Sequence, residues 1–471
     1  MSIQPERNGA ALNEVVEEVM AAAQVPGAVV GITLGDQTLT ASYGVTNVNH
    51  RLPVTTDTYF QIGSITKTFT GTAVLRLADQ GRLDLDAPVR EYLPNFRVAD
   101  EHASAAVTVR HLLTHSPGWT GDFFHDTGSG DDALARYVEA MATLEQQAPL
   151  GQLYSYNNAG FVLLGRILEV VSGSSFAALL HDLVLEPLGL EQSTLDPTVV
   201  MTERFVVGHT RGQDGPAVAR PWALPRYAQP GGGLICTVSD LLRYAAFHLA
   251  GSGSVNGSKL LAAERLAEMQ HPQVQIGGQQ DAVGLSWFIT DFQGVSTLSH
   301  GGGTVGQGAY LLLAPEQELA LAIMTNGQQG GRVIETVRDW TLAHYLNVDV
   351  PKPEPRDVDP AELEPLLGRY RRPMADIELD LDEEGRLIGQ LQFNQGFPTE
   401  AERPRPAPPP FACALIGPEQ LMVLEGPFSR AQGEFIRDSK GAVGWLRVSG
   451  RLHRRVAPDQ DDRPIQEDND A

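Results

Sequence analysis

The sequence predicts a mixed α/β (α+β) protein, in which an antiparallel sheet flanked by helices holds an inserted all-helical subdomain and precedes a small C-terminal antiparallel β barrel-like domain. Strand-like segments occur at about residues 25–60 and return at about 285–347, whereas helical periodicity dominates about 64–285. A stretch rich in proline and charge at 348–362 then leads into short strands at 363–457. A chain of 471 residues with 42% apolar content is long enough for two folded units.

The predicted first domain covers residues 1–347 and begins with an amphipathic helix that ends before Pro26. The run GAVVGITLGDQTLTASYGV reads as two strands joined at Gly35 and Asp36, a strong hairpin signal. Further strands are predicted in VSTLSHGGG, GAYLLLAPEQ and ELALAIMTNG, and the helix GRVIETVRDWTLAHYL closes the domain. We expect the two groups of strands, although distant in the chain, to form one sheet.

Between these strands, apolar residues recur at helical spacing. The predicted helices lie in FTGTAVLRLADQG, TVRHLLTHS, ALARYVEAMATLEQ, GFVLLGRILEVVSG, SDLLRYAAFHLAG and AERLAEMQ. Each is followed by glycine, proline or polar loop residues. This pattern predicts a helical subdomain, and a site in the cleft between it and the sheet.

The C-terminal part of the chain has a different sequence pattern. After the linker, Ile377, Leu379 and Leu381 alternate with acidic residues, and short strands follow in RLIGQLQF, FACALIG, QLMVLEG and VGWLRVSGRL. These features predict a small barrel or sandwich over 363–457. The acidic, polar stretch at 458–471 is predicted to be disordered.

The charge and composition of the chain restrict the classes of partner that it is expected to bind. The formal net charge of −23 repels phosphate backbones and anionic lipid, which argues against nucleic acid and membrane surfaces. Without an apolar leader or a window of membrane-spanning length, the expected location is the cytoplasm. Cys236 and Cys413 are far apart and outside any metal-ligand spacing, so both are expected to be buried free thiols.

The pair Ser64 and Lys67 carries the first chemical signal. The chain has only four lysines, and this one follows a serine by three residues at the start of a helical pattern, which puts both side chains on one face. Serine becomes a nucleophile when a neighbouring base takes its proton, and a buried lysine can be that base. A helix N-terminus would also favour an oxyanion. The alternative is an N-capping serine followed by a surface lysine.

Two further segments hold candidate site residues. Tyr156 and Asn158 lie two apart before an apolar helix, where a phenol could relay a proton and an amide could hold substrate; the alternative is a loop tyrosine and a capping asparagine. His300 ends a strand that runs into glycines, whose backbone could approach a ligand closely; the alternative is a loose glycine-rich turn. His111 and His115 have the spacing of zinc ligands but lack an evident third ligand, which favours a structural role.

Taken in order, SxxK, YxN and HxG resemble the three motifs of the serine β-lactamase and penicillin-binding-protein superfamily, in detail its class C β-lactamase-related hydrolases. TVRHLLTHSPGW and PGGGLICTVSDLLRY are also similar to that family's signatures, and the resemblance covers about residues 10–347. It implies a β-lactamase/transpeptidase-like fold and an acyl-enzyme mechanism without metal or organic cofactor. The residues that match the family's site are the nucleophile Ser64, the base Lys67, the proton-shuttling Tyr156, the substrate-facing Asn158, and His300 with Gly302 in the third motif; Gly303 would supply an oxyanion N–H beside that of Ser64.

One departure from the family pattern bears on the substrate. The β-lactamases proper usually carry a lysine in the third motif, whereas His300 is neutral or partly charged near pH 7. Esters, amides and D-amino-acid peptides are therefore favoured as small-molecule or short-peptide substrates over β-lactams. A β-lactamase or D,D-carboxypeptidase is the alternative enzyme, and an acylatable penicillin sensor or scaffold is the alternative outside catalysis. The C-terminal β domain is expected either to cap the cleft or to act as a stabilising or oligomer-forming appendage.

Overall fold

The computed structural model describes residues 5–255, 258–278, 280–426 and 428–456, and the tail at 458–471 that was predicted to be disordered lies outside them. The described chain forms two compact units. The first contains residues up to 119, 125–153 and 157–351. The second contains residues from 352 onward together with two short segments, Thr120–Phe124 and Tyr154–Tyr156.

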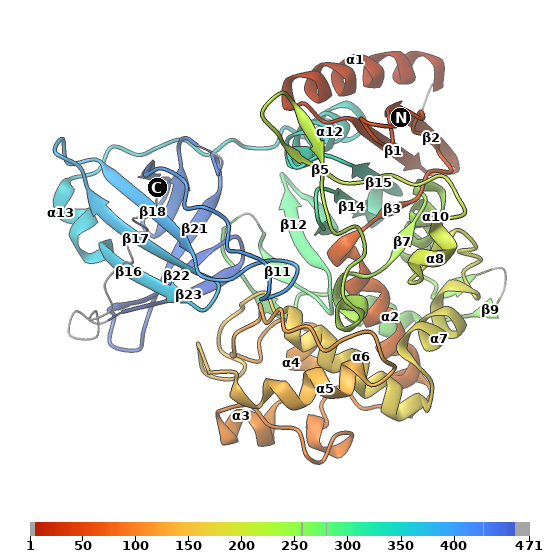
Figure 1. Ribbon diagram of the computed structural model, residues 1–471, viewed down its shortest axis with the longest axis horizontal. Helices are drawn as coiled ribbons and strands as arrows, with labels where there is room; N and C mark the ends of the chain where they lie inside the picture. The colour runs from red at the N-terminus through yellow and green to blue at the C-terminus, as the bar shows by residue number, and fades with distance from the viewer. Residues whose placement is uncertain (1–4, 256–257, 279, 427, 457–471) are drawn as a thin grey trace. The chain divides into compact units, whose positions relative to one another are not determined.

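The first unit is built on an eight-stranded sheet, shown in Figure 1, that joins the two ends of the unit. Along the sheet the strands are β10 (Val274–Gln275), β11 (Ala282–Val283), β12 (Phe288–Phe292), β13 (Val295–Gly303), β14 (Gly308–Ala314), β15 (Leu319–Thr325), β1 (Gly27–Leu34) and β2 (Gln37–Gly44). Each neighbouring pair is antiparallel. The predicted hairpin at Gly35 is present, and β1 pairs with β15, which confirms that strands distant in the chain form one sheet.

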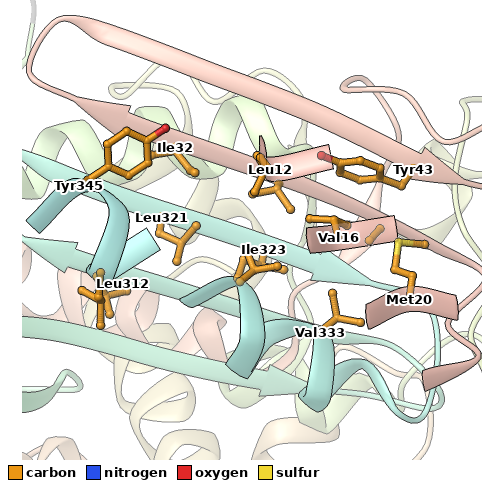
Figure 2. Close-up of a cluster of buried hydrophobic side chains, with 14 of the residues drawn as sticks. Leu12, Val16, Met20, Ile32, Tyr43, Leu312, Leu321, Ile323, Val333 and Tyr345 are labelled. Atoms are coloured by element: carbon orange, nitrogen blue, oxygen red, sulfur yellow. The ribbon is translucent and has the colours of Figure 1, made fainter. Parts of the chain in front are cut away.

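One face of this sheet packs against α1 (Pro5–Ala23) and α12 (Gly330–Leu346). Because side chains alternate along a strand, Val30 and Ile32 of β1 and Leu321 and Ile323 of β15 all point to this face. The helices add apolar side chains to the same cluster, among them Leu12, Val16 and Met20 from α1 and Val333 from α12 (Figure 2). Full burial of each such side chain contributes about 1.5–3 kcal/mol.

The opposite face is covered by α10 (Val238–Leu249). Gly31 lies under this helix: a Cβ atom there would be 2.7 Å from Leu242 Cδ1 and 2.8 Å from Val238 Cγ2. The glycine therefore lets α10 approach the strand closely, which gives the sheet a helical layer on both faces.

The segment between the two groups of sheet strands is mainly helical. Its helices, besides α10, are α2 (Thr66–Asp79), α3 (Glu101–Ala106), α4 (Val109–Leu113), α5 (Ala133–Ala140), α6 (Asn158–Ser172), α7 (Phe176–Leu180), α8 (Pro197–Val200), α9 (Gln229–Gly232) and α11 (Ala263–Gln270). It also holds short strands, too brief to leave an alternating pattern in the sequence. These are β3 (Phe60–Gln61), β7 (Ile235–Cys236) and β4 (Ser193–Thr194) in one sheet, and the hairpins β5 (His209–Arg211) with β6 (Pro216–Val218) and β8 (Ser254–Val255) with β9 (Ser258–Lys259).

The second unit contains a closed antiparallel barrel. Its strands are β16 (Gly368–Arg372), β17 (Ala375–Leu381), β18 (Leu387–Phe393), β19 (Phe411–Leu415), β20 (Gln420–Val423), β21 (Gln432–Arg437), β22 (Val443–Val448) and β23 (Arg451–Arg455). The barrel closes where β23 pairs with β16, and Tyr370, Phe435 and Leu446 lie in its core. The predicted small β domain is confirmed. β16 and β21 were not predicted, and the short helix α13 (Pro360–Leu363) begins inside the predicted linker.

Both cysteines, Cys236 and Cys413, are buried and free, as expected. Among the described residues, no single helix has the length and apolar character needed to cross a membrane; one bent pair, α6 with Phe176–Leu185, meets the criteria of length and composition alone.

Candidate active site

Ser64 lies in a single 3-10 turn, Gly63–Ile65, that leads directly into α2. Gly63 has φ +52°, and a Cβ atom there would be 2.6 Å from the backbone nitrogen of Gly303. Glycine is thus required twice, for the left-handed backbone and for the close approach of the strand β13. Ser64 itself is half-buried, whereas Gly63 and Ile65 on either side are buried. The turn therefore leaves the serine partly accessible.

Lys67 is fully buried one turn further along α2. Its Nζ lies 3.1 Å from Ser64 Oγ and donates a hydrogen bond of 2.5 Å to the carbonyl oxygen of Gly231. The same nitrogen is 5.4 Å from the centre of the Phe161 ring. The structure therefore brings the predicted nucleophile and base into direct contact, in a setting that excludes the alternative of a surface lysine.

The segment around Gly231 is the part of the site to which the sequence pattern assigned no role. Threonines of α2 hold it: Thr70 Oγ1 donates to the carbonyl oxygen of Pro230 at 2.7 Å, and Thr66 Oγ1 accepts from the backbone N–H of Leu234 at 3.0 Å. The PGGG run in this segment was the available signal, because consecutive glycines allow a backbone carbonyl to approach a buried side chain. Its partner, 164 residues earlier in the chain, is not marked by any local pattern.

The glycines after His300 lie against the turn that carries Ser64. A Cβ atom on Gly302 would be 1.8 Å from the carbonyl oxygen of Ile62 and 3.0 Å from the backbone nitrogen of Ser64, whereas one on Gly303 would meet nothing within 4 Å. The end of β13 and the nucleophile turn are thus packed backbone to backbone. The predicted HxG glycine is the one that this contact requires.

We expect Gly302→Ala to lower the turnover number by about 100-fold and to destabilise the protein by about 2–4 kcal/mol, because the Ser64 turn must move. Gly303→Ala is the matched control, and it should change the free energy of unfolding by less than about 0.5 kcal/mol because its Cβ enters open space and its N–H remains. Steady-state kinetics and urea unfolding measure both effects. Equal behaviour of the two variants would contradict the close packing of Gly302.

His300 is buried on β13, with only 1% of its surface exposed. Its Nδ1 lies 2.6 Å from the carbonyl oxygen of Gly301, and its ring lies 5.1 Å from that of Phe288. Burial, with a smaller effect of the Lys67 charge, lowers the pKa of His300 to about 3. The third motif of this chain therefore carries a neutral side chain at pH 7, where the β-lactamases proper carry a lysine.

Because the protein has buried histidines, we expect its free energy of unfolding to fall in mild acid. Burial also lowers the pKa of His248 to about 3. In the unfolded chain the pKa of a histidine is about 6.5, so protonation of His248 favours the unfolded chain. The contribution of the neutral His248 to the free energy of unfolding is therefore complete above about pH 6.5 and is lost as the pH falls toward the pKa of the folded state. We expect His248→Gln to flatten the decline of the urea midpoint between about pH 6.5 and 4.5, whereas His102→Gln, at an exposed histidine, should leave the slope unchanged. Identical slopes for the two variants would count against this account.

Asn158 is the first residue of α6, and Asn157 before it caps the helix. The side-chain oxygen of Asn157 accepts from the N–H of Gly160 at 2.8 Å, and its amide nitrogen donates to the carbonyl oxygen of Trp119 at 2.9 Å. Asn157, the middle residue of YxN, is fully buried and holds the start of α6. The capping role foreseen as the alternative for Asn158 belongs to its neighbour.

His111 and His115, the pair with zinc-ligand spacing, make separate structural hydrogen bonds. His111 Nδ1 accepts from the backbone N–H of Thr108 at 3.1 Å and helps to cap α4. His115 Nδ1 accepts from the backbone N–H of Asn157 at 2.9 Å. These contacts are of the capping and packing kind that the sequence favoured.

Tyr156 belongs to the second compact unit, together with the barrel. Its backbone N–H donates to the carbonyl oxygen of Gly450 at 2.8 Å, and its side chain is only 6% exposed. Tyr154 is also buried and belongs to the same unit. The YxN motif is therefore shared: its tyrosine is grouped with the barrel and its asparagine with the helical unit.

A pocket of about 430 Å³ adjoins the nucleophile turn within the first unit. Gln61 and Gly232 line it, and Gly232 lies next to Gly63, with less than 4 Å between the Cβ position of Gly232 and the Gly63 backbone. The large apolar side chains that line the pocket are Leu185, Leu195, Trp222, Leu224 and Ile235, and the charged or titratable ones are His181, Asp196 and Arg226. A pocket with this mixed lining can hold an apolar group and can also bind polar groups.

An antiparallel sheet covered by helices, with a serine in contact with a buried lysine opposite a glycine-rich strand, defines the β-lactamase/transpeptidase fold. A family model described as Beta-lactamase matches residues 12–344, and the chain belongs to this family, whose members are generally serine hydrolases. It is 36% identical over 363 residues to Penicillin-binding protein 4 of Amycolatopsis lactamdurans, which covers 74% of this chain and 93% of that protein.

Similar solved structures cover different lengths of this chain. A class C β-lactamase from Rhodobacter sphaeroides is similar with a TM-score of 0.60 and 24% identity, covering 71% of this chain and 99% of that one. SurE, also described in a structure with D-Leu, is similar over 95% of this chain and 99% of its own, with 24% identity and TM-scores of 0.73 and 0.74. The likeness in fold to SurE therefore includes the C-terminal barrel.

Proposed function

We propose that this protein is a serine hydrolase that forms an acyl-enzyme on Ser64 and cleaves an ester, an amide or a D-amino-acid peptide with an apolar acyl group. The observation that carries the proposal is the 3.1 Å contact between Ser64 Oγ and the fully buried Lys67 Nζ. Burial disfavours a charged ammonium, and the neutral amine is the form that can take the serine proton.

The proposed reaction has two steps. Ser64 Oγ attacks the substrate carbonyl carbon as its proton passes to Lys67, and the N–H groups of Ser64 and Gly303 stabilise the tetrahedral oxyanion. The proton taken up by Lys67 passes through Tyr156 to the leaving group while Asn158 faces the substrate, and the C–O or C–N bond to that group breaks. Water then attacks the acyl carbon, its proton goes to Ser64 Oγ as the C–O bond to Ser64 breaks, and the acid is released.

Two features support the substrate class. The neutral His300 provides no fixed positive charge for the carboxylate that β-lactam drugs carry, which disfavours a β-lactamase or D,D-carboxypeptidase. The pocket beside Gly232 is lined in part by apolar side chains, which can hold an apolar acyl side chain, and SurE, similar in fold, is described with D-Leu. A D-configured apolar residue on the acyl side is therefore the favoured substrate.

The test compares p-nitrophenyl butyrate, D-leucyl and L-leucyl p-nitroanilides, D-alanyl amide and nitrocefin with the same enzyme preparation. We expect the ester and the D-leucyl compound to be turned over with kcat/KM values at least about 10-fold above that of nitrocefin, a difference of about 1.4 kcal/mol in transition-state binding. Preference for nitrocefin would favour the β-lactamase alternative. Stoichiometric labelling of Ser64 without turnover of any substrate would favour a sensor.

A further inference from the structure

The hairpin of β22 and β23 makes a hydrogen bond to each residue of Tyr154–Tyr156, to the backbone of the two tyrosines and to the side chain of Ser155. Within this compact unit, Arg447 donates to the carbonyl oxygen of Tyr154 at 3.2 Å, and the backbone N–H of Leu452 donates to Ser155 Oγ at 3.2 Å. Tyr156 donates its own N–H to the carbonyl oxygen of Gly450 at 2.8 Å. Three consecutive residues of the YxN segment are thus held by one turn of the barrel.

The same hairpin covers the two tyrosine rings with guanidinium groups. Arg451 lies 4.6 Å from the ring centre of Tyr156, and Arg447 lies 5.7 Å from that of Tyr154. A guanidinium over an aromatic face fixes the orientation of the ring and is attracted to its electron density. The shorter contact is the one made to the candidate proton shuttle.

Arg451 is itself held in place by a buried carboxylate. Its Nε donates to Asp122 at 3.2 Å, and Asp122 also accepts from Arg372 at 2.7 Å. The Asp122 side chain is only 3% exposed. Burial acts to lower the pKa of Arg451, but Asp122 and then the Tyr156 phenol outweigh it and raise that pKa. The guanidinium therefore has a fixed position and interacts electrostatically with the phenol below it.

We propose that Arg451 is a positioning residue for Tyr156, which orients the phenol for the proton transfer assigned to it. This inference rests on the proposed function, because it assumes that the Tyr156 hydroxyl passes a proton to the leaving group. Arg451 exchanges no proton itself, since a guanidinium stays charged. It orients the ring, and its charge favours the negative charge that develops on the phenol oxygen as the proton leaves.

Positioning of Tyr156 is thus a further role for the barrel. The sequence had suggested that the barrel caps the cleft or is a stabilising or oligomer-forming appendage. A purely stabilising contact would alter the free energy of unfolding and leave the turnover number of the folded enzyme unchanged. A positioning contact alters the turnover number and leaves substrate binding nearly unchanged. This difference separates the two roles.

The test compares Arg451→Met and Arg451→Lys with Arg454→Met, an exposed arginine on the same strand, in the full-length chain. We expect Arg451→Met to lower kcat by about 10- to 30-fold with KM within about 3-fold, and added guanidinium ion to restore part of the loss. Arg451→Lys, which keeps the charge but not the planar stack, should fall between, with a thermal midpoint close to that of the wild type. Arg454→Met should match the wild type in kcat.

A double-mutant cycle with Tyr156→Phe shows whether the effect passes through the phenol hydroxyl. If it does, Arg451→Met lowers kcat in the wild-type background and causes little further loss in the Tyr156→Phe background. Full, additive losses would overturn the inference, as would wild-type kcat in both Arg451 variants while Tyr156→Phe is impaired. Wild-type turnover by Tyr156→Phe would instead overturn the proton-transfer role assigned to that phenol under the proposed function.

Discussion

Replacing Ser64 by alanine abolishes turnover of every substrate in the panel, with an expected loss in kcat on the order of 10⁴- to 10⁶-fold. The hydroxyl is the only atom group removed, and it is the group that forms the bond to the acyl carbon. Since Ser64 sits half-buried in a turn whose backbone is held by Gly63 and β13, the thermal midpoint should stay within about 3 °C of the wild type. Steady-state kinetics and thermal unfolding of the purified variant measure both.

The control is Ser174→Ala, at an exposed serine just beyond α6, which should keep full activity. Mass spectrometry after treatment with a fluorophosphonate provides a second readout: one adduct on the wild type and on Ser174→Ala, located at Ser64, and none on Ser64→Ala. Turnover that survives in Ser64→Ala would exclude the acyl-enzyme scheme.

Lys67→Arg should lower kcat by about 10³-fold or more, because arginine stays protonated and cannot accept the serine proton. Lys67→Met should be equally inactive for the same reason, since a thioether is no base. Methionine also fills a similar volume without placing an amine among buried groups, so this variant should fold at least as stably as the wild type. The acylation rate with the fluorophosphonate should fall along with kcat.

Lys259→Arg serves as the control, because Lys259 is exposed and its replacement should leave kcat unchanged. An active Lys67→Arg variant would show that Lys67 acts as a fixed charge beside Ser64 and not as a proton acceptor. A folded Lys67→Met variant with wild-type kcat would remove the lysine from the mechanism altogether.

Much of the fold could be predicted because its signals are local. The β1–β2 hairpin is marked by a two-residue turn at Gly35 and Asp36, and the amphipathic helices carry their spacing within a few turns. Strands β16 and β21 were missed because an arginine-rich segment and a short mixed segment lack a clear alternation, and they become strands by pairing with their neighbours in the barrel. The pairing of β16 with β17 and β23, and of β21 with β20 and β22, supplies the hydrogen bonds that the two sequences alone do not specify.

In the candidate site, too, only the contacts between residues close in sequence could be predicted. Ser64 and Lys67 are three residues apart on one helix face, so their contact of 3.1 Å is implied by helix geometry once the helix is predicted. Gly231, Asp122 and Arg451 could not be found in this manner. Each contacts a partner that is far away in the sequence, and no local pattern marks that partner.

By itself, then, the sequence determined the class of fold, the order of the motifs and the adjacent serine and lysine, because these depend on contacts within one element or one turn. Only the tertiary structure decided that Lys67 is buried against a distant carbonyl group, that His300 is buried and neutral, and that the barrel hairpin holds the tyrosine of YxN. Those features depend on which distant segments pack together, and packing is set by the sum of many weak contacts over the whole chain.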